Sequence, residues 1–332
     1  MTTEFVDVAD VGARLEATGY FTDVGIDTVV FLAAKLGKPI LVEGPAGVGK
    51  TELAKSVAMA LGAALVRLQC YEGLDEAKAL YEWNYARQLL RITHARTAVA
   101  LPSTAAALGD GSDTGVVSSD TGAVGSDAGA VSDEAQAWSH VETELFSEDF
   151  LLERPLLHAI RRSADEPTVL LVDEVDKVDF EFEALLLEVL SDFQVTIPEL
   201  GTLSARRRPF VVLTSNATRE LSEALKRRCL YLHLDYPTIE REEAIIRARV
   251  PELDDTIVTQ VARVVRALRE LDLKKPPSIS ETIDWARTIV ALGVAALDRD
   301  LVDRTLGVLL KYDDDLAIAA GGLRLPTAQP SD

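Results

Sequence analysis

The sequence is poor in cysteine and has no long hydrophobic run. Cys70 and Cys229 are the only cysteines among 332 residues, too few for a disulfide framework, so we expect reduced thiols and a cytoplasmic protein. No stretch of 18 or more apolar residues occurs, which argues against a membrane-spanning helix. Residues 1–10 carry acids, whereas a signal peptide would begin with basic residues ahead of an apolar stretch.

Basic residues are also scarce, and lysine most of all. The chain holds 54 acidic residues against 34 basic ones, and only 10 of the bases are lysine. A net charge of −20 repels phosphate backbones, so binding of nucleic acid is not expected. Adaptation to high salt, where screening shortens the reach of self-repulsion, accounts for such a surface; a basic partner protein is the alternative.

One segment lacks basic residues altogether. Residues 102–149 contain ten acidic side chains, no lysine or arginine, and much glycine, alanine and serine. This composition buries too little apolar surface to offset the entropy of ordering, so disorder is predicted over about 103–138. Because strand-like sequence resumes beyond it, we interpret the tract as an insertion within a domain.

Short apolar runs alternate with helical patterns on both sides of this tract. Strands are predicted at 39–42, 64–68, 167–172 and 210–213, and helices at 28–36 and 50–61. The alternation predicts an α/β fold with a parallel sheet flanked by helices. Helical periodicity then takes over at 239–249, 256–271, 280–297 and 301–312. We therefore predict a nucleotide-binding α/β domain at 1–235 and a small all-helical lid domain at 236–332.

The segment GPAGVGKT, from Gly44 to Thr51, matches the phosphate-loop pattern G-x-x-x-x-G-K-[ST]. Its glycines allow successive backbone N–H groups to point at a phosphate at the start of a helix. Lys50 supplies a positive charge for the β- and γ-phosphates, and the Thr51 hydroxyl supplies a ligand for Mg²⁺. Because the loop follows a predicted strand and opens a predicted helix, we expect ATP and Mg²⁺ as the ligands.

A second buried strand, VLLV at 169–172, ends in two adjacent carboxylates, Asp173 and Glu174. Ligands of α/β proteins lie at the carboxyl ends of the strands. Asp173 suits the Mg²⁺ shell together with Thr51, and Glu174 suits the polarisation of the water that attacks the γ-phosphate. The residues predicted to bind the nucleotide are Gly44, Pro45, Ala46, Gly47, Val48, Gly49, Lys50, Thr51, Glu52 and Asp173.

Three further polar residues follow the last predicted strand. Asn216 ends the run VVLTSN and is positioned to reach the γ-phosphate and the attacking water; a helix N-cap is the alternative. Arg227 and Arg228 end a short helical segment, LKRR. They are candidates for an arginine finger that completes a neighbouring subunit's site, and complementation of the helix dipole is the alternative.

The order of these motifs resembles the AAA+ ATPases, and more narrowly the MoxR family and its CoxD-like branch, which is associated with maturation of carbon monoxide dehydrogenase. Six segments carry the resemblance, at 41–55, 67–92, 145–160, 170–202, 211–231 and 305–312. It implies that Lys50 and Thr51 are the Walker A pair, Asp173 and Glu174 the Walker B pair, and Asn216 sensor 1. It also makes Arg228 the arginine finger, with Arg227 as the runner-up.

The same resemblance places a sensor 2 arginine near the start of the helix at 280–297. The chain has Glu281 there, and Arg287 follows nearly two turns later, so this role has no matching residue. Tyr81, Trp83 and Tyr85 lie in a segment that resembles the family's inserted helical element, where either core packing or contact with a client protein would explain them.

The family implies a ring, a hexamer by resemblance, that pairs with a von Willebrand A-domain protein. It also implies ATP-driven assembly of a client metalloenzyme, such as the molybdenum hydroxylase carbon monoxide dehydrogenase. An ATP-switched binding scaffold with slow turnover is the alternative function. A small-molecule kinase has no evident acceptor site in this sequence. The four histidines have no ligand spacing, so no protein metal site other than that for Mg²⁺ is expected.

Overall fold

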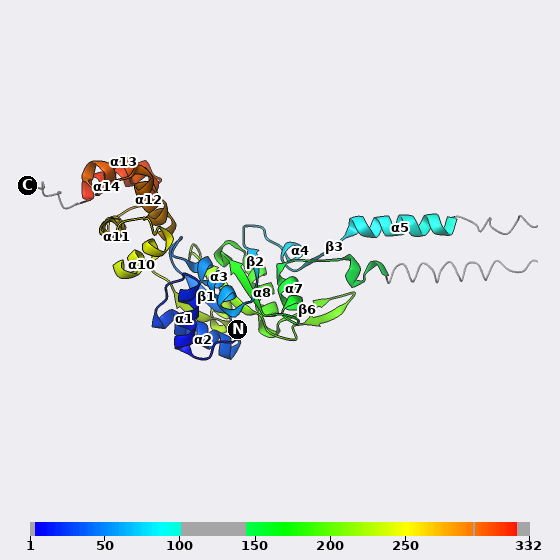
Figure 1. The fold of residues 1–332 in the computed structure, drawn as a ribbon. Helices are drawn as coiled ribbons and strands as arrows, with labels where there is room; N and C mark the ends of the chain where they lie inside the picture. The colour runs from blue at the N-terminus through cyan, green and yellow to red at the C-terminus, as the bar shows by residue number, and fades with distance from the viewer. Residues whose placement is uncertain (1–3, 101–143, 295, 324–332) are drawn as a thin grey trace, which may run out of the picture.

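The structure is a computed structural model of the chain and describes residues 4–100, 144–294 and 296–323. The acidic tract predicted at 103–138 lies outside these ranges. Within them, a parallel sheet flanked by helices is followed by a group of C-terminal helices with its own hydrophobic core (Figure 1). No helix in the described part of the chain has both the length and the hydropathy needed to cross a bilayer.

Five parallel strands form the central sheet, which confirms the predicted α/β architecture. Their order across the sheet is β2-β5-β8-β1-β9. The strand β8 therefore lies between β1, which leads into the phosphate loop, and β5, which ends at Asp173. This order brings all three predicted polar strand ends to one edge of the sheet. The strands are β1 (Ile40–Glu43), β2 (Ala64–Gln69), β5 (Thr168–Asp173), β8 (Phe210–Ser215) and β9 (Leu230–His233).

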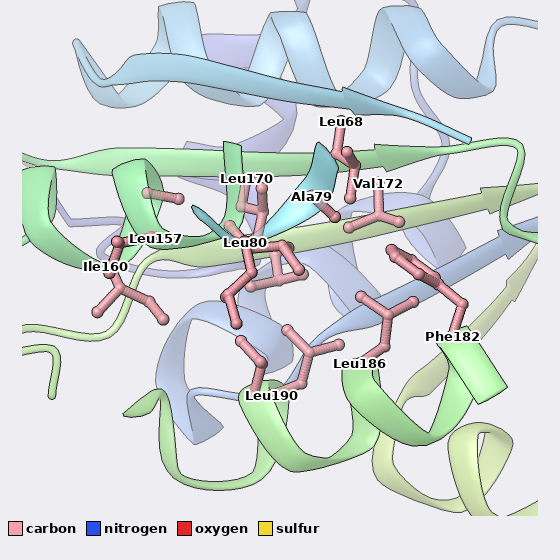
Figure 2. Close-up of a cluster of buried hydrophobic side chains, with 14 of the residues drawn as sticks. Leu68, Ala79, Leu80, Leu157, Ile160, Leu170, Val172, Phe182, Leu186 and Leu190 are labelled. Atoms are coloured by element: carbon pink, nitrogen blue, oxygen red, sulfur yellow. The ribbon is translucent and has the colours of Figure 1, made fainter. Parts of the chain in front are cut away.

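Helices cover both faces of this sheet, and each face has its own core. Side chains alternate along β5, so that Val169 and Leu171 join one hydrophobic cluster while Leu170 and Val172 join the other. The strand is buried along its whole length, as its unbroken apolar sequence predicts. One face is covered by α1 (Val8–Ala17), α2 (Val24–Leu36) and α3 (Lys50–Leu61), and the other by α7 (Pro155–Arg162) and α8 (Phe180–Asp192). Figure 2 shows this second core, in which leucines of α7 and α8 meet those of β2 and β5.

Two small two-stranded antiparallel sheets accompany the central sheet in the described part of the chain. In the first of these sheets, β3 (Tyr81–Trp83) pairs in antiparallel fashion with β4 (Leu151–Glu153), and α5 (Tyr85–Ala100) projects away from the body (Figure 1). Trp83 is buried and packs edge-to-face against Phe146, with the ring centroids 5.3 Å apart, so core packing explains this residue. Tyr85 is exposed. The remaining elements are α4 (Glu76–Ala79), the 3₁₀ turns η1 (Glu148–Phe150) and η2 (Val175–Lys177), the hairpin β6 (Gln194–Ile197) with β7 (Gly201–Ser204), and α9 (Glu223–Arg228).

In the part of the chain that the structure describes, five C-terminal helices, called the lid here, share a hydrophobic core that contains Trp285. The indole Nε1 of Trp285 donates a hydrogen bond to Thr305 Oγ1 at 2.8 Å, so its polar atom is satisfied inside an apolar core. The helix predicted at 280–297 ends at Leu292, because Gly293 adopts a left-handed conformation and caps it. A fifth helix was not predicted from the sequence. The lid helices are α10 (Ile239–Arg249), α11 (Asp255–Arg269), α12 (Ile279–Leu292), α13 (Arg299–Leu309) and α14 (Asp313–Gly322).

Candidate nucleotide site

The loop between β1 and α3 runs so close to other backbone that two of its glycines leave no room for a side chain. A Cβ on Gly44 would lie 1.9 Å from the carbonyl oxygen of Leu234. Gly47 has φ of 76°, and a Cβ there would lie 2.3 Å from Cβ of Ser278, at the start of α12. Ile279 N donates to the carbonyl oxygen of Gly47 at 3.2 Å. The lid therefore rests directly on the phosphate loop.

Lys50 is the first residue of α3, and its ammonium group is folded back under the loop. Nζ donates to the carbonyl oxygens of Gly44 and Pro45, both at 2.7 Å, and to Oδ1 of Asn216 at 2.8 Å. Burial lowers the pKa of Lys50, and the nearby carboxylates of Asp176, Asp173 and Glu174 oppose that effect. A buried cation held by neutral oxygens is suited to exchange these partners for phosphate oxygens.

Asp173 is buried at the end of β5, and both of its oxygens are hydrogen-bonded. Oδ1 accepts from the hydroxyls of Thr51 at 3.0 Å and Thr214 at 2.5 Å. Oδ2 accepts from Nε and Nη2 of Arg67, at 3.1 and 2.6 Å. The sequence did not single out Arg67, which reaches the site from the neighbouring strand β2.

Glu174 has a left-handed backbone, with φ of 60°, which non-glycine residues seldom adopt and which recurs at functional sites. Its backbone N–H donates to Thr214 Oγ1 at 2.9 Å. Its Oε2 accepts from Gln69 Nε2 at 3.0 Å and from Lys177 Nζ at 2.5 Å. The hydrogen bond and charge of Glu174 raise the pKa of Lys177. Both carboxylates of this pair thus have cationic partners in the chain itself.

The backbone of Asn216 is held by the buried carboxylate of Asp176, which was not predicted from the sequence as a site residue. Asp176 accepts from the backbone N–H groups of Asn216 and Thr218, at 3.2 and 3.1 Å, and from the Thr218 hydroxyl at 2.6 Å. Burial raises the pKa of Asp176, but these hydrogen bonds outweigh burial, and the pKa lies below its usual range. The signal was present in the sequence, since Asp176 follows the Asp-Glu pair by two residues.

A cavity of about 640 Å³ is lined by Lys50, Thr51, Asp173, Glu174 and Asn216, and also by residues of the lid. Arg287 of α12 lines this cavity, and its side chain pairs with Asp284 at 3.6 Å. From its position in the sequence, Arg287 did not match the expected place of a sensor 2 arginine. Tyr20 and Arg241 also line the cavity, and no sequence pattern pointed to either. They come from elements far from the motifs, so only tertiary packing could identify them.

Arg227 and Arg228 do not line this cavity. They end α9, just before β9 begins, and so lie at the amino-terminal edge of the sheet, opposite the phosphate loop. Arg227 pairs with Glu223 at 2.8 Å, and both partners are exposed. Arg228 is exposed, and no ion pair of its side chain occurs with any other described residue. Neither arginine serves the site of its own chain.

The donor set of the site fits a magnesium nucleotide. Hard oxygens from Thr51 and Asp173 lie together next to the loop, and Mg²⁺ binds through one or two such groups plus phosphate oxygens and water. Over the ranges that the structure describes, no group of three or more histidine, cysteine, aspartate or glutamate side chains gathers as a metal cage. Mg²⁺ at a nucleotide site does not need one.

Comparison with known proteins agrees with a nucleotide-binding fold over part of the chain. Residues 39–115 match a family model described as an AAA domain of the dynein-related subfamily. The chain is similar to the RuvB Holliday junction branch migration motor of Thermotoga maritima, at 16% identity, over 91% of this chain and 70% of that chain, with a TM-score of 0.42. A variant of the same motor gives 17% identity, 95% and 74% coverage, and a TM-score of 0.44. No curated protein matches the chain. Because these structural scores are low, the function has to be derived from the residues of the site.

Proposed function

We propose that this protein is an AAA+ ATPase that binds ATP with Mg²⁺ and hydrolyses it to ADP and phosphate. The observation that carries the proposal is the convergence of Lys50, Thr51 and Asp173 with Glu174 and Asn216 around one cavity beside a phosphate loop. Lys50 and Thr51 begin α3, Asp173 and Glu174 lie at the end of β5, and Asn216 follows β8, so three separate parts of the chain meet at the cavity. A cavity of about 640 Å³ is of the size that small-molecule sites have.

Each residue has a distinct part in the reaction. Lys50 would exchange its carbonyl partners for phosphate oxygens, and Thr51 and Asp173 would hold Mg²⁺, which would neutralise charge on the phosphates. Glu174 would accept a hydrogen bond from the attacking water and orient that water towards the γ-phosphate. Asn216, fixed by Asp176 and already bonded to Lys50, is placed to orient the same phosphate. Lid residues such as Arg287 also line the cavity, on the side of α12.

A pair of variants tests this assignment. Lys50→Ala is expected to abolish nucleotide binding, because the cation contacts ground-state phosphates. Glu174→Gln is expected to retain binding and lose turnover, because the carboxylate acts on water. Equilibrium binding of a fluorescent ATP analogue and release of phosphate measure the two steps separately. Wild-type turnover by Glu174→Gln would refute the role of Glu174.

The finer assignment is a MoxR-type protein of the CoxD-like branch that works as a ring, with Arg228, or else Arg227, completing the site of the next subunit. The exposure of Arg228 and its distance from its own phosphate loop support a role in trans. A von Willebrand A-domain partner and a client metalloenzyme, such as a molybdenum hydroxylase, belong to the same proposal. The genes that flank this one provide a direct check, since molybdenum hydroxylase subunits beside it would favour this client.

One observation favours a second function, an ATP-switched binding scaffold with slow turnover. The Glu174 carboxylate is already engaged by Gln69 and Lys177, so it has to leave both before it can orient water. The turnover rate of the assembled protein separates the two functions. Turnover that stays slow at saturating ATP, in assembled protein and with a partner present, would favour the scaffold.

A further inference from the structure

Arg67 occupies the side of Asp173 that faces away from the threonine hydroxyls. Two of its guanidinium nitrogens donate to Asp173 Oδ2, while Thr51 and Thr214 donate to Oδ1. The carboxylate therefore has four donors from the chain before any ligand arrives. A cation that is to be held by Asp173 has to displace or weaken one of them.

Arg67 is the donor best able to give way. Thr214 is buried on β8 and also accepts from Glu174 N, so its hydroxyl is fixed in place. The side chain of Arg67 is 50% exposed, whereas that of Asp173 is 4% exposed. A half-exposed guanidinium can exchange a carboxylate for water, whereas a buried hydroxyl cannot. Gln69 Oε1, two residues along the same strand, already accepts a hydrogen bond from Arg67, so the guanidinium keeps one partner after it leaves.

The charges around the loop indicate what Arg67 contributes when no nucleotide is bound. Lys50, Arg67 and Lys177 balance the three carboxylates of Asp173, Glu174 and Asp176. Without Arg67, Asp173 would be a buried anion with only neutral donors, directly beside the position of the phosphates. It would then attract a divalent cation more strongly and repel a nucleotide that arrives without one.

We propose that Arg67 is a positioning residue that acts as a resident counter-ion for Asp173 and competes with Mg²⁺ for it. The proposal rests on the proposed function, since it concerns how the same site acquires its metal. In the absence of nucleotide, Arg67 keeps the Asp173 carboxylate neutralised and aligned, and it sets the Mg²⁺ concentration at which the nucleotide complex forms. Gln69 bonds both Arg67 and Glu174, so it links the guanidinium to the proposed catalytic glutamate.

The test compares Arg67→Met with wild type in equilibrium binding of N-methylanthraniloyl-ATP, followed by fluorescence anisotropy. Binding is measured first in EDTA and then across a titration with Mg²⁺. Loss of a surface ion pair changes an equilibrium constant by about a fewfold at most, and loss of a buried pair by more than about a hundredfold. For the half-buried pair of Arg67 and Asp173 we therefore expect a change of about tenfold in the Mg²⁺ requirement. We expect Arg67→Met to lower the half-saturating Mg²⁺ concentration by that factor and to weaken binding in EDTA.

These opposite changes separate the proposal from a loss of structure, which weakens binding in both conditions. Arg67→Lys keeps the charge and is expected to behave much like wild type. Arg91→Met is the matched control, because Arg91 has similar exposure and pairs with Glu144 at 2.8 Å, outside the cavity. If Arg67→Met fails to fold, as judged by thermal unfolding, Arg67→Gln replaces it.

The proposal is overturned if folded Arg67→Met, or Arg67→Gln in its place, has the Mg²⁺ requirement of the wild type. It is also overturned if the nucleotide affinity falls both in EDTA and in Mg²⁺. Absence of nucleotide binding by the wild type overturns the proposed function instead. The two failures are therefore distinguishable in one experiment.

Discussion

Gly47 is the position at which the phosphate loop meets the lid, and the motif itself places no demand on it. The pattern G-x-x-x-x-G-K-[ST] leaves this residue open. In the structure its φ is 76°, and an added Cβ would lie 2.3 Å from Cβ of Ser278 and 2.9 Å from its hydroxyl oxygen. Gly47→Ala therefore combines an unfavourable backbone with a collision against the first residues of α12.

The free-energy cost of the backbone conformation and that of the collision have different origins. A left-handed conformation costs a non-glycine residue about 1–2 kcal/mol. Carbon atoms pack at about 3.5–4.0 Å, so a contact at 2.3 Å requires the lid to move by more than about 1 Å. Overpacking of this kind typically costs about 1–3 kcal/mol. Because the lid is a separate packed unit, we expect part of this second cost to appear as displacement of α12 and not as unfolding.

Gly62 provides the matched control, since it caps α3 with φ of 60° and an added Cβ there meets nothing within 4 Å. Gly62→Ala should lower the free energy of unfolding by about 1–2 kcal/mol in urea titration, with nucleotide affinity unchanged. Gly47→Ala should in addition weaken nucleotide affinity by at least about tenfold, which corresponds to about 1.4 kcal/mol. Displacement of the lid breaks the bond from Ile279 N to Gly47 O and withdraws the cavity wall.

A second substitution, at Ser278, tests whether the collision is what weakens nucleotide affinity in Gly47→Ala. Ser278→Gly removes the opposing Cβ and still leaves a tolerated N-cap residue. We expect it to lower the free energy of unfolding by only about 0.5 kcal/mol. The double variant should bind nucleotide more tightly than Gly47→Ala alone, which is a favourable coupling in a double-mutant cycle. Equal nucleotide affinities for Gly47→Ala and Gly62→Ala, or no recovery in the double variant, would refute this reasoning.

Three further outcomes are expected. A mixture of Arg228→Ala and Lys50→Ala subunits should hydrolyse ATP although each variant alone is inactive, because some interfaces combine an intact loop with an intact finger. A mixture that assembles but stays inactive would reassign the finger to Arg227 or remove it. Deletion of residues 103–138 should leave thermal unfolding in matched salt and basal ATPase activity unchanged, since an acidic tract rich in glycine, serine and alanine adds no core; a large fall in the unfolding temperature would contradict this. The protein should be more stable in molar salt than in dilute buffer, because screening reduces repulsion among 54 acidic residues against 34 basic ones. Chemical denaturation at several concentrations of sodium chloride measures this, and a stability that falls or stays level would count against it.

Much of the fold and part of the candidate site could be predicted because the signals are local. The helix predicted at 50–61 has those bounds in the structure, and the strands predicted at 167–172 and 210–213 match β5 and β8 with small shifts. An unbroken apolar run between polar ends is a property of the strand itself. The short strand β9 and the last helix α14 were not predicted, since neither has a distinctive local pattern and both are stabilised by contacts with distant elements.

The sequence by itself determined which chemical groups follow each buried strand: a phosphate loop after β1, Asp173 and Glu174 at the end of β5, and Asn216 after β8. Spacing and residue type carry that information, because backbone geometry converts a local pattern into an element and leaves its last side chains at the sheet edge. Only the tertiary structure decided what surrounds those groups. Arg67, from a strand more than a hundred residues before Asp173, reaches the Asp173 carboxylate, and Arg287, from a lid helix, lines the cavity. Both are brought there by the packing of elements far apart in the chain. Such contacts depend on how whole elements pack, and no local pattern in the sequence encodes that.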